Sequence, residues 1–170
     1  MTMNWLRRTA VLAACASAAL LTACGSSSVE SAFTPTRIVS FGDALSDVGQ
    51  TGTRFTINDG STNVWSQQFA ASYGTTLTAV SAGGQGYARG NARVSATPDA
   101  AGVATTLTLK QQIDAFLAAD SIREGDMLVL NGGISDVIAQ MAAVTAGTIS
   151  PDDMVNNTTA AGREMGAQVR

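Results

Sequence analysis

The chain of 170 residues has no histidine and two cysteines, Cys15 and Cys24. Without histidine these residues cannot form a Ser-His or Cys-His catalytic pair or a His-based metal site. Aromatic residues make up 5% and charged residues 14% of the chain, and the formal net charge is -3. No basic patch or stripe indicates a nucleic-acid partner. No apolar run is long enough to leave a permanent membrane span after processing.

The hydrophobic content of 45% is sufficient for one compact domain with a core.

The N-terminal residues have the pattern of an export signal. Arginines at positions 7 and 8 precede a short apolar stretch over residues 9–20, which is the order of a targeting segment. This segment is therefore excluded from the analysis of the fold.

The export segment ends in Leu-Thr-Ala-Cys at positions 21–24, which resembles a bacterial lipobox. The resemblance implies that residues 1–23 are a lipoprotein signal peptide and that Cys24 becomes the lipidated mature N-terminus. It further implies a membrane anchor at the cell envelope. Gly25 and Ser26 favour the outer membrane, facing the periplasm or the surface. The alternative is an ordinary secretory signal in which Cys24 is incidental. With Cys15 cleaved and Cys24 lipidated, the folded domain has no internal disulfide.

Residues 24–36 form a Ser-rich tether, and the folded domain begins at residue 37. Apolar and β-branched runs predict strands over 37–41, 75–80 and 126–131, and residues 81–106 are expected to be a long loop. Helical spacing and capping residues predict four helices, over 63–71, 109–120, 135–146 and from Ser150 to the chain end. Alternating strands and helices indicate an α/β domain with a parallel sheet covered on both faces. A further strand is expected beyond residue 170.

Three separated segments carry the strongest functional signal. Residues 37–47, RIVSFGDALSD, read as a buried strand entering a tight Gly-Asp turn with Ala44 at its apex. The other two segments are GYARGNARV at 86–94 and DMLVLNGGISD at 126–136. In this order and spacing the three resemble the GDSL, or SGNH, ester hydrolases, and residues 64–70 and 107–117 resemble helices of bacterial members. The resemblance implies a three-layer, flavodoxin-like α/β/α fold, with residues 37–170 a partial domain whose C-terminal part is missing.

The family hydrolyses carboxylic esters with a serine nucleophile, a histidine base and an aspartate that orients the base. Carried onto this sequence, the nucleophile position is Ala44. The resemblance assigns the oxyanion donors to the Ala44 N–H, the Gly90 N–H and Ser135, where the family has asparagine. The family's Asp-x-x-His segment lies beyond this chain's end. Losing the nucleophile costs about a millionfold in rate, and losing one oxyanion donor about 100- to 1000-fold. We therefore predict that the chain does not hydrolyse esters.

The resemblance implies no metal or organic cofactor, and a small-molecule or lipid ester as the ligand. One alternative is a non-catalytic lipoprotein that uses the same pocket to bind lipids or glycans. Another is a structural envelope protein that uses only the fold.

Several further residues have structural interpretations. We expect the Ser46 hydroxyl to bond local backbone, and Asp43 and Asp47 to cap turns rather than act as an acid/base pair. The glycine-rich residues 83–86 lack the lysine of a phosphate-binding loop. Trp65 and Phe69 are expected in the core, and Asp152 and Asp153 are expected to be first-turn helix acids.

Overall fold

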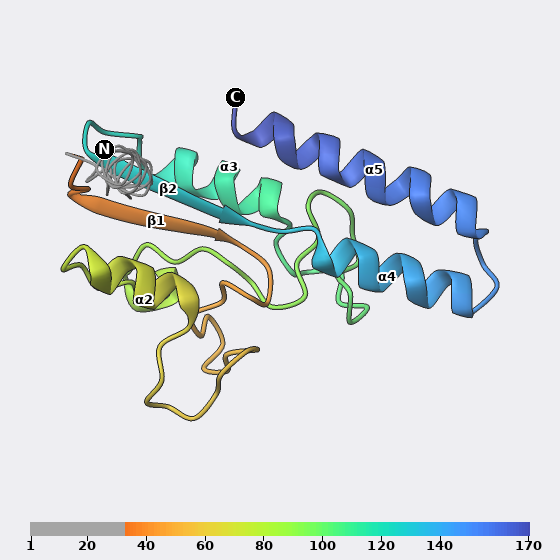
Figure 1. The fold of residues 1–170 in the computed structure, drawn as a ribbon, viewed down its shortest axis with the longest axis horizontal. Helices are drawn as coiled ribbons and strands as arrows, with labels where there is room; N and C mark the ends of the chain where they lie inside the picture. Colours follow the sequence, from red (N-terminus) through yellow and green to blue (C-terminus); the bar gives the residue numbers. More distant parts are fainter. Residues whose placement is uncertain (1–32) are drawn as a thin grey trace, which may run out of the picture. The chain divides into compact units, whose positions relative to one another are not determined.

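The structure is a computed structural model that describes residues 33–170. The expected signal peptide at 1–23, Cys24 and most of the tether lie outside the described residues. The elements, in chain order, are β1 (Arg37–Gly42), α2 (Trp65–Ser72), the 3-10 turn η1 (Val80–Ala82), α3 (Leu109–Ala119), β2 (Asp126–Asn131), α4 (Ile134–Thr145) and α5 (Pro151–Gln168) (Figure 1). The predicted α/β class is confirmed.

The two strands form a parallel pair, with Arg37 opposite Asp126 and Gly42 opposite Asn131. Successive side chains of a strand point to opposite faces, so each face needs its own cover. On one face Val39 and Phe41 pack against Phe116 of α3. On the other face Ile38 packs with Ala70 of α2. Helices therefore cover both faces of the pair, as predicted for a buried parallel sheet, with α2 and α3 on opposite sides (Figure 1).

The predicted strand over 75–80 is wrong. The Thr75 N–H closes the C-terminus of α2 by donating to the Ala70 carbonyl (3.1 Å). Only Ala79 makes a bridge, with Gly86, and the chain then turns through η1. Leu77 is nonetheless buried against the α2 face of the sheet. The β-branched residues of this segment contribute to the core without forming a strand.

Part of the predicted loop over 81–106 takes the place beside β1 instead. The bonds are between backbone groups: the Ser40 N–H donates to the Gln85 carbonyl (3.0 Å), the Tyr87 N–H to the Ser40 carbonyl (2.7 Å), and the Arg89 N–H to the Gly42 carbonyl (3.0 Å). The bridge between Ser40 and Gly86 is parallel. Residues 85–89 thus run along the edge of β1 opposite β2, even though their composition is that of a loop.

The starts of α3 and α5 agree with capping residues in the sequence. Thr108 accepts a hydrogen bond from the Gln111 N–H at the start of α3 (3.2 Å). Ser150 accepts from the Asp153 N–H (3.1 Å), and Pro151 follows as the first residue of α5. Asp153 therefore serves as a helix acid, as predicted, and its hydrogen bonds to Ser150 lower the pKa of its carboxyl.

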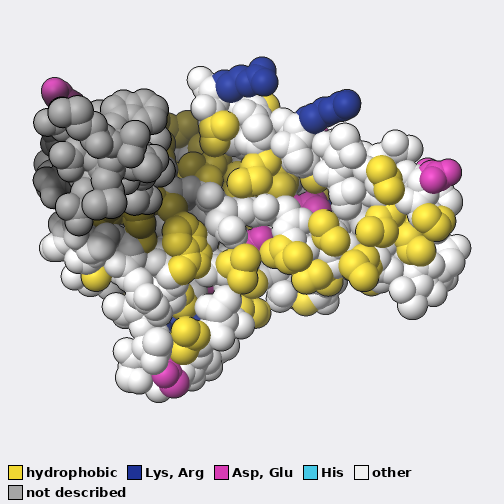
Figure 2. All heavy atoms as spheres, in the orientation of Figure 1, with side chains coloured by type: hydrophobic (Ala, Val, Ile, Leu, Met, Phe, Trp, Pro, Cys, Tyr) yellow, Lys and Arg dark blue, Asp and Glu magenta, His cyan; other side chains and the backbone are white. Residues whose placement is uncertain are grey.

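Helix α4 carries an exposed apolar face. Ile138 and Met141 are 50% and 54% exposed, and Ile134 at the start of the helix is also exposed. Figure 2 shows hydrophobic side chains along this side of α4. Every residue of β2 is only partly buried. Among residues 33–170, no helix has the length and hydropathy needed to cross a membrane.

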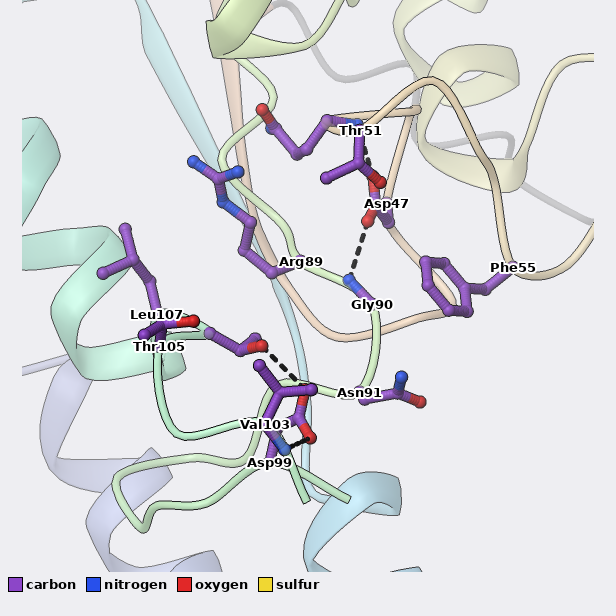
Figure 3. A pocket seen from close by; sticks show the side chains of 12 residues that line it. Asp47, Thr51, Phe55, Arg89, Gly90, Asn91, Asp99, Val103, Thr105 and Leu107 are labelled. Atoms are coloured by element: carbon purple, nitrogen blue, oxygen red, sulfur yellow. Dashed lines mark hydrogen bonds between the residues drawn. The ribbon is translucent and has the colours of Figure 1, made fainter. Parts of the chain in front are cut away.

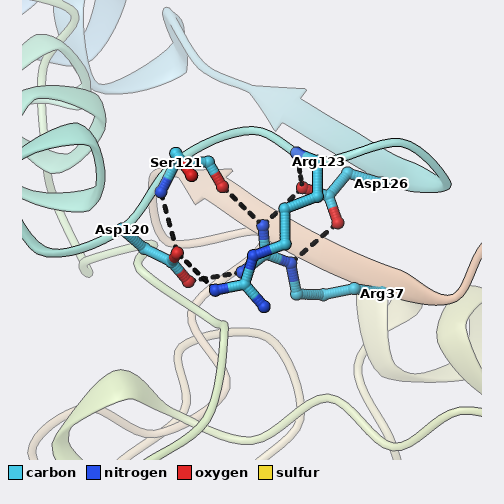
Figure 4. A network of polar contacts seen from close by, with 5 residues as sticks. All are labelled: Arg37, Asp120, Ser121, Arg123 and Asp126. Atoms are coloured by element: carbon cyan, nitrogen blue, oxygen red, sulfur yellow. Dashed lines mark hydrogen bonds and ion pairs between the residues drawn. The ribbon is translucent and has the colours of Figure 1, made fainter.

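A polar network joins the amino-terminal ends of both strands to the end of α3 (Figure 4). Arg37 donates to both carboxylate oxygens of Asp126, with 2.8 Å from Nε to Oδ1, and its Nη1 lies 2.5 Å from Asp120 Oδ2. Its guanidinium carbon also lies 5.5 Å from the centroid of the Phe116 ring. The hydrogen bond from Arg37 lowers the pKa of Asp126. The pKa of the Asp120 carboxyl falls to about 2, mainly because the carboxylate accepts a hydrogen bond from the Ser121 N–H. Hydrogen bonds from Arg123 and Arg37 lower this pKa further.

We expect Arg37→Met to destabilise the fold by about 2–4 kcal/mol, because it leaves the buried Asp126 carboxylate without its partner. A depressed carboxyl pKa stabilises the fold above the ordinary value near 4, and this contribution is lost as the pH falls through the folded value. The loss in the variant should therefore be large at pH 7 and should shrink towards pH 2. Urea unfolding at several pH values measures it, with Arg163→Met on α5 as the control. Equal effects of the two variants would contradict the assignment.

Candidate functional site

The three motif segments reach the same edge of the sheet. Ala44 lies two residues after the end of β1, and Ser135 lies in the first turn of α4, just after β2. Gly90 follows the segment that runs parallel to β1 on its other side. The carboxyl ends of parallel strands form the edge where open α/β sheets bind ligands. This edge is therefore the candidate site.

Aspartates join the motif segments to one another. Asp47 Oδ2 accepts from the Gly90 N–H at 2.7 Å, which ties the first segment to the second. Asp136 accepts from the Val94 N–H (2.9 Å) and from Arg93 Nε (3.2 Å), which ties the third to the second. Asp43 accepts from the backbone of Ile134, which ties the first to the third. Each pair of segments is thus held by at least one buried carboxylate.

The turn that carries Ala44 starts from Gly42, whose position is tightly constrained. Its φ is +150°, and a Cβ there would lie 2.2 Å from the Asn131 carbonyl oxygen, so only glycine fits beside β2. The fully buried amide of Gln112 satisfies the Gly42 backbone, since Oε1 accepts from its N–H (2.8 Å) and Nε2 donates to its carbonyl (2.9 Å). A side chain of α3 therefore fixes the start of the turn.

Ala44 stands at the apex of a hydrogen-bonded turn. The N–H groups of Ser46 and Asp47 both donate to the Asp43 carbonyl, at 3.0 and 3.1 Å. Ala44 is partly exposed, and its N–H has no acceptor among residues 33–170. The apex thus presents a methyl group together with an uncommitted backbone donor.

The second expected donor, Gly90, is engaged inside the chain. Its N–H donates to Asp47, and the Phe55 ring lies against it, so that a Cβ on Gly90 would be 2.0 Å from Phe55 Cε2. Figure 3 shows Phe55 beside this contact. An oxyanion would have to compete with Asp47 for this donor. The next residue, Asn91, has a positive φ of 61° and borders the same cavity.

Ser135 is buried, with 2% of its surface exposed, and lies beside the buried Asp136.

Two polar atoms near this edge of the sheet lack a partner among the described residues, Asp43 Oδ2 and Asn131 Oδ1. Unsatisfied buried polar atoms cost about 1–3 kcal/mol each and mark places where a ligand or an ordered water stabilises the protein.

Asp43 and Asp47 both cap turns, as predicted. Asp43 Oδ1 accepts from the Leu45 N–H (3.1 Å), and Asp47 Oδ1 accepts from the Gly49 and Gln50 N–H groups (2.8 and 3.0 Å). Burial raises the pKa of the Asp43 carboxyl, against the backbone hydrogen bonds from Leu45 and Ile134, which lower it. The negative charge of Asp136 raises it further. Asp43 is therefore a buried carboxyl for which ionisation is unfavourable.

Two interpretations of side chains near the turn were wrong. The Ser46 hydroxyl does not bond local backbone, because it accepts from the Trp65 indole Nε1 at 3.1 Å. Trp65 is 40% exposed rather than part of the core. Phe69, one helical turn further on, does pack against the α2-side core. The indole N–H finds its acceptor in a buried serine, which keeps the Trp65 ring at the surface next to the turn.

Two cavities lie beside the turn. The Trp65 cavity, of about 510 Å³, is mostly apolar and is bordered by Leu45, Val64, Trp65 and Asn131, among others. The Arg89 cavity, of about 430 Å³, is bordered by Asp47, Arg89 and Gly90 together with the loop around Asp99 (Figure 3). Leu45, the residue after Ala44, borders the Trp65 cavity, and Gly90 borders the Arg89 cavity.

The arrangement offers hydrogen-bond donors and apolar walls but no nucleophile. The apex residue is alanine, and histidine is absent from the sequence. Within residues 33–170, no group of three His, Cys, Asp or Glu residues is placed to hold a metal ion. Residues 83–86 open no helix, because the Gln85 carbonyl and Tyr87 N–H bond to β1 instead.

Sequence reasoning missed three residues that shape the site. Gln112 lies on a helix among other polar residues, and only its contact with Gly42 distinguishes it. Phe55 lies in a loop with no periodic pattern. Arg89 lies within the second motif segment, and its Nε is buried without a partner among the described residues. No local pattern in the sequence marks these contacts.

The raised pKa of Asp43 predicts a pH dependence that Asp43→Asn should remove. The neutral form suits the buried site, so its contribution to stability is present below the ordinary pKa near 4 and is lost as the pH rises through the raised folded value. Relative to the parent chain, Asp43→Asn should therefore gain stability between pH 4 and pH 8. Urea unfolding across this range measures the difference, with Asp114→Asn on the exposed side of α3 as control. A difference that does not change with pH would contradict this account.

Comparison with known proteins adds no relative to these observations. No family model, curated protein or solved structure matches the chain. Inferences about function therefore depend on the residues and their geometry.

Proposed function

We propose that residues 37–170 have the three-layer α/β/α layout of a GDSL ester hydrolase, with Ala44 in the place of the serine nucleophile. On this proposal the chain retains an ester-binding site and does not hydrolyse esters. The observation that carries it is the meeting of the three motif segments at one sheet edge, held by Asp43, Asp47 and Asp136. Ala44, at the apex of the first segment, offers a methyl group and an uncommitted N–H.

The oxyanion site of this proposal is incomplete. The Ala44 N–H is available, the Gly90 N–H is shared with Asp47, and Ser135 is buried with a short side chain. Preorganised donors accelerate acyl transfer only when they meet the oxygen where charge develops. An incomplete site without a nucleophile agrees with binding in place of turnover.

The second candidate is a non-catalytic lipid- or glycan-binding lipoprotein, and the Trp65 cavity favours its lipid form. Leu45 and Trp65 are both about 40% exposed at its wall. Ligand sites are typically apolar cavities with a few placed polar groups. The two candidates differ in what position 44 does. The first requires Ala44 to face the ligand's carbonyl carbon, and the second does not.

We expect the chain as it stands to release no 4-nitrophenolate from 4-nitrophenyl butyrate above the background rate, and Ala44→Cys to become acylated. Near neutral pH a small fraction of the introduced thiol gives up its proton to solvent, and the resulting thiolate attacks the activated ester, displacing 4-nitrophenolate. The acyl-enzyme should accumulate because no histidine promotes its hydrolysis. A background of Cys15→Ser and Cys24→Ser leaves one thiol. A burst of one equivalent should form at least about tenfold faster than with Ala118→Cys, an exposed control on α3.

Adding Ser135→Asn supplies the amide donor and should raise the acylation rate by about 100-fold. Equal rates for Ala44→Cys and Ala118→Cys would refute the placement of residue 44 in the site. Ester turnover by the unaltered chain would refute the proposed loss of activity.

We also propose that Cys24 anchors the protein in the cell envelope, with the outer membrane as its location. This rests on the lipobox-like residues 21–24, outside the described part of the chain. Cys24→Ser should abolish incorporation of radiolabelled palmitate in bacteria that express the full chain, while Cys15→Ser should leave the mature protein labelled. Unchanged labelling of Cys24→Ser would remove the anchor from the proposal.

A further inference from the structure

The Arg89 side chain borders its cavity as an unpaired cation. The Arg89 guanidinium makes no hydrogen bond or ion pair with any residue in 33–170, and its Nε is buried from solvent. Most other arginines of this part of the chain, such as Arg37 and Arg93, bind aspartates. A buried donor without a partner marks a place where a ligand or an ordered water belongs.

The two carboxylates of the cavity are already occupied by the loops that carry them. Asp47 accepts from three backbone N–H groups, the last of them that of Gly90. Asp99 accepts from the N–H groups of Ala101 and Val103, both at 2.8 Å, and from the Thr106 hydroxyl at 2.7 Å. Neither carboxylate lies within ion-pair distance of Arg89. In Figure 3 the Arg89 guanidinium and the Phe55 ring lie on opposite sides of the Asp47–Gly90 contact.

Part of the remaining wall is apolar and suits the apolar part of a small molecule. Phe55 and Val103 are each 47% exposed at the cavity, and Leu107 adds a third apolar side chain. The volume of about 430 Å³ is that of a site for a small molecule. A planar guanidinium binds carboxylates through two parallel hydrogen bonds.

We propose that the Arg89 cavity binds a small monocarboxylate, with the carboxylate on the Arg89 guanidinium and a short apolar chain against the apolar part of the cavity wall. This cavity shares Gly90 with the proposed ester site but does not include Ala44, and the role of Arg89 stands whether or not the ester site is correct. Asp47 and Asp99 add negative charge to the cavity, which favours a ligand with one carboxylate over a dianion.

Saturation-transfer NMR on the full chain tests this with sodium butyrate, butyramide and inorganic phosphate as probes. We expect saturable butyrate binding with a dissociation constant at or below about 10 mM, the range of small ligands held by one ion pair and a few apolar contacts. Butyramide has nearly the same shape without the charge and should bind at least about tenfold more weakly. Phosphate should not displace butyrate. Equal binding of butyrate and butyramide, no saturable binding, or displacement of butyrate by phosphate at equal concentration would each overturn the proposal.

Variants locate the site. Arg89→Gln should weaken butyrate binding at least about tenfold, whereas Arg163→Gln, an exposed arginine of α5 without an ion pair in the described structure, should leave it within about twofold. Val103→Glu places a competing carboxylate at the cavity wall and should also abolish binding. Val103 is half exposed, so this variant keeps the test valid if Arg89→Gln fails to fold. Butyrate binding that survives Val103→Glu or a folded Arg89→Gln unchanged would refute the site.

Discussion

The close approach of β1 and β2 at Gly42 is the constraint from which the rest of the site follows. A Cβ at this position would lie 2.2 Å from the Asn131 carbonyl oxygen, so the strands can meet in this register only with glycine there. The buried amide of Gln112 then satisfies both backbone groups of Gly42. The Gly42 carbonyl also accepts a hydrogen bond from the Arg89 backbone N–H. Gly42 therefore aligns β1, β2, α3 and the segment at 85–89.

Buried aspartates extend this alignment to the loops. Asp47 and Asp136 each hold backbone N–H groups of the second motif segment, and Asp43 holds the start of α4. A charge that accepts several N–H donors is stabilised by them, whereas an unpaired buried charge is costly. These acids therefore brace the loops, and only Asp43 retains an oxygen without a partner in the described structure. At the opposite end of the sheet, ion pairs of Arg37 with Asp120 and Asp126 join the strands to α3.

The result is a sheet edge at which three segments are firmly held and Ala44 stands at the apex of the turn. The apex of the turn, the neighbouring donors and two cavities are all held by buried contacts, although Ala44 supplies no oxygen. The apolar face of α4 remains exposed among residues 33–170, and β2, although it packs against both cores, is only partly buried.

The sequence by itself determined the parallel strands at 37–42 and 126–131, the existence of the helices, and the capping residues that start α3 and α5. These depend on short apolar runs, helical spacing and caps, which are local properties of the chain. Only the tertiary structure decided that residues 85–89 and not 75–80 run beside β1. It also decided that Trp65 stays at the surface on Ser46, and that the Gly90 N–H goes to Asp47. Those outcomes depend on which groups compete for the same hydrogen-bond partner across long separations in the chain, and no local pattern records that competition.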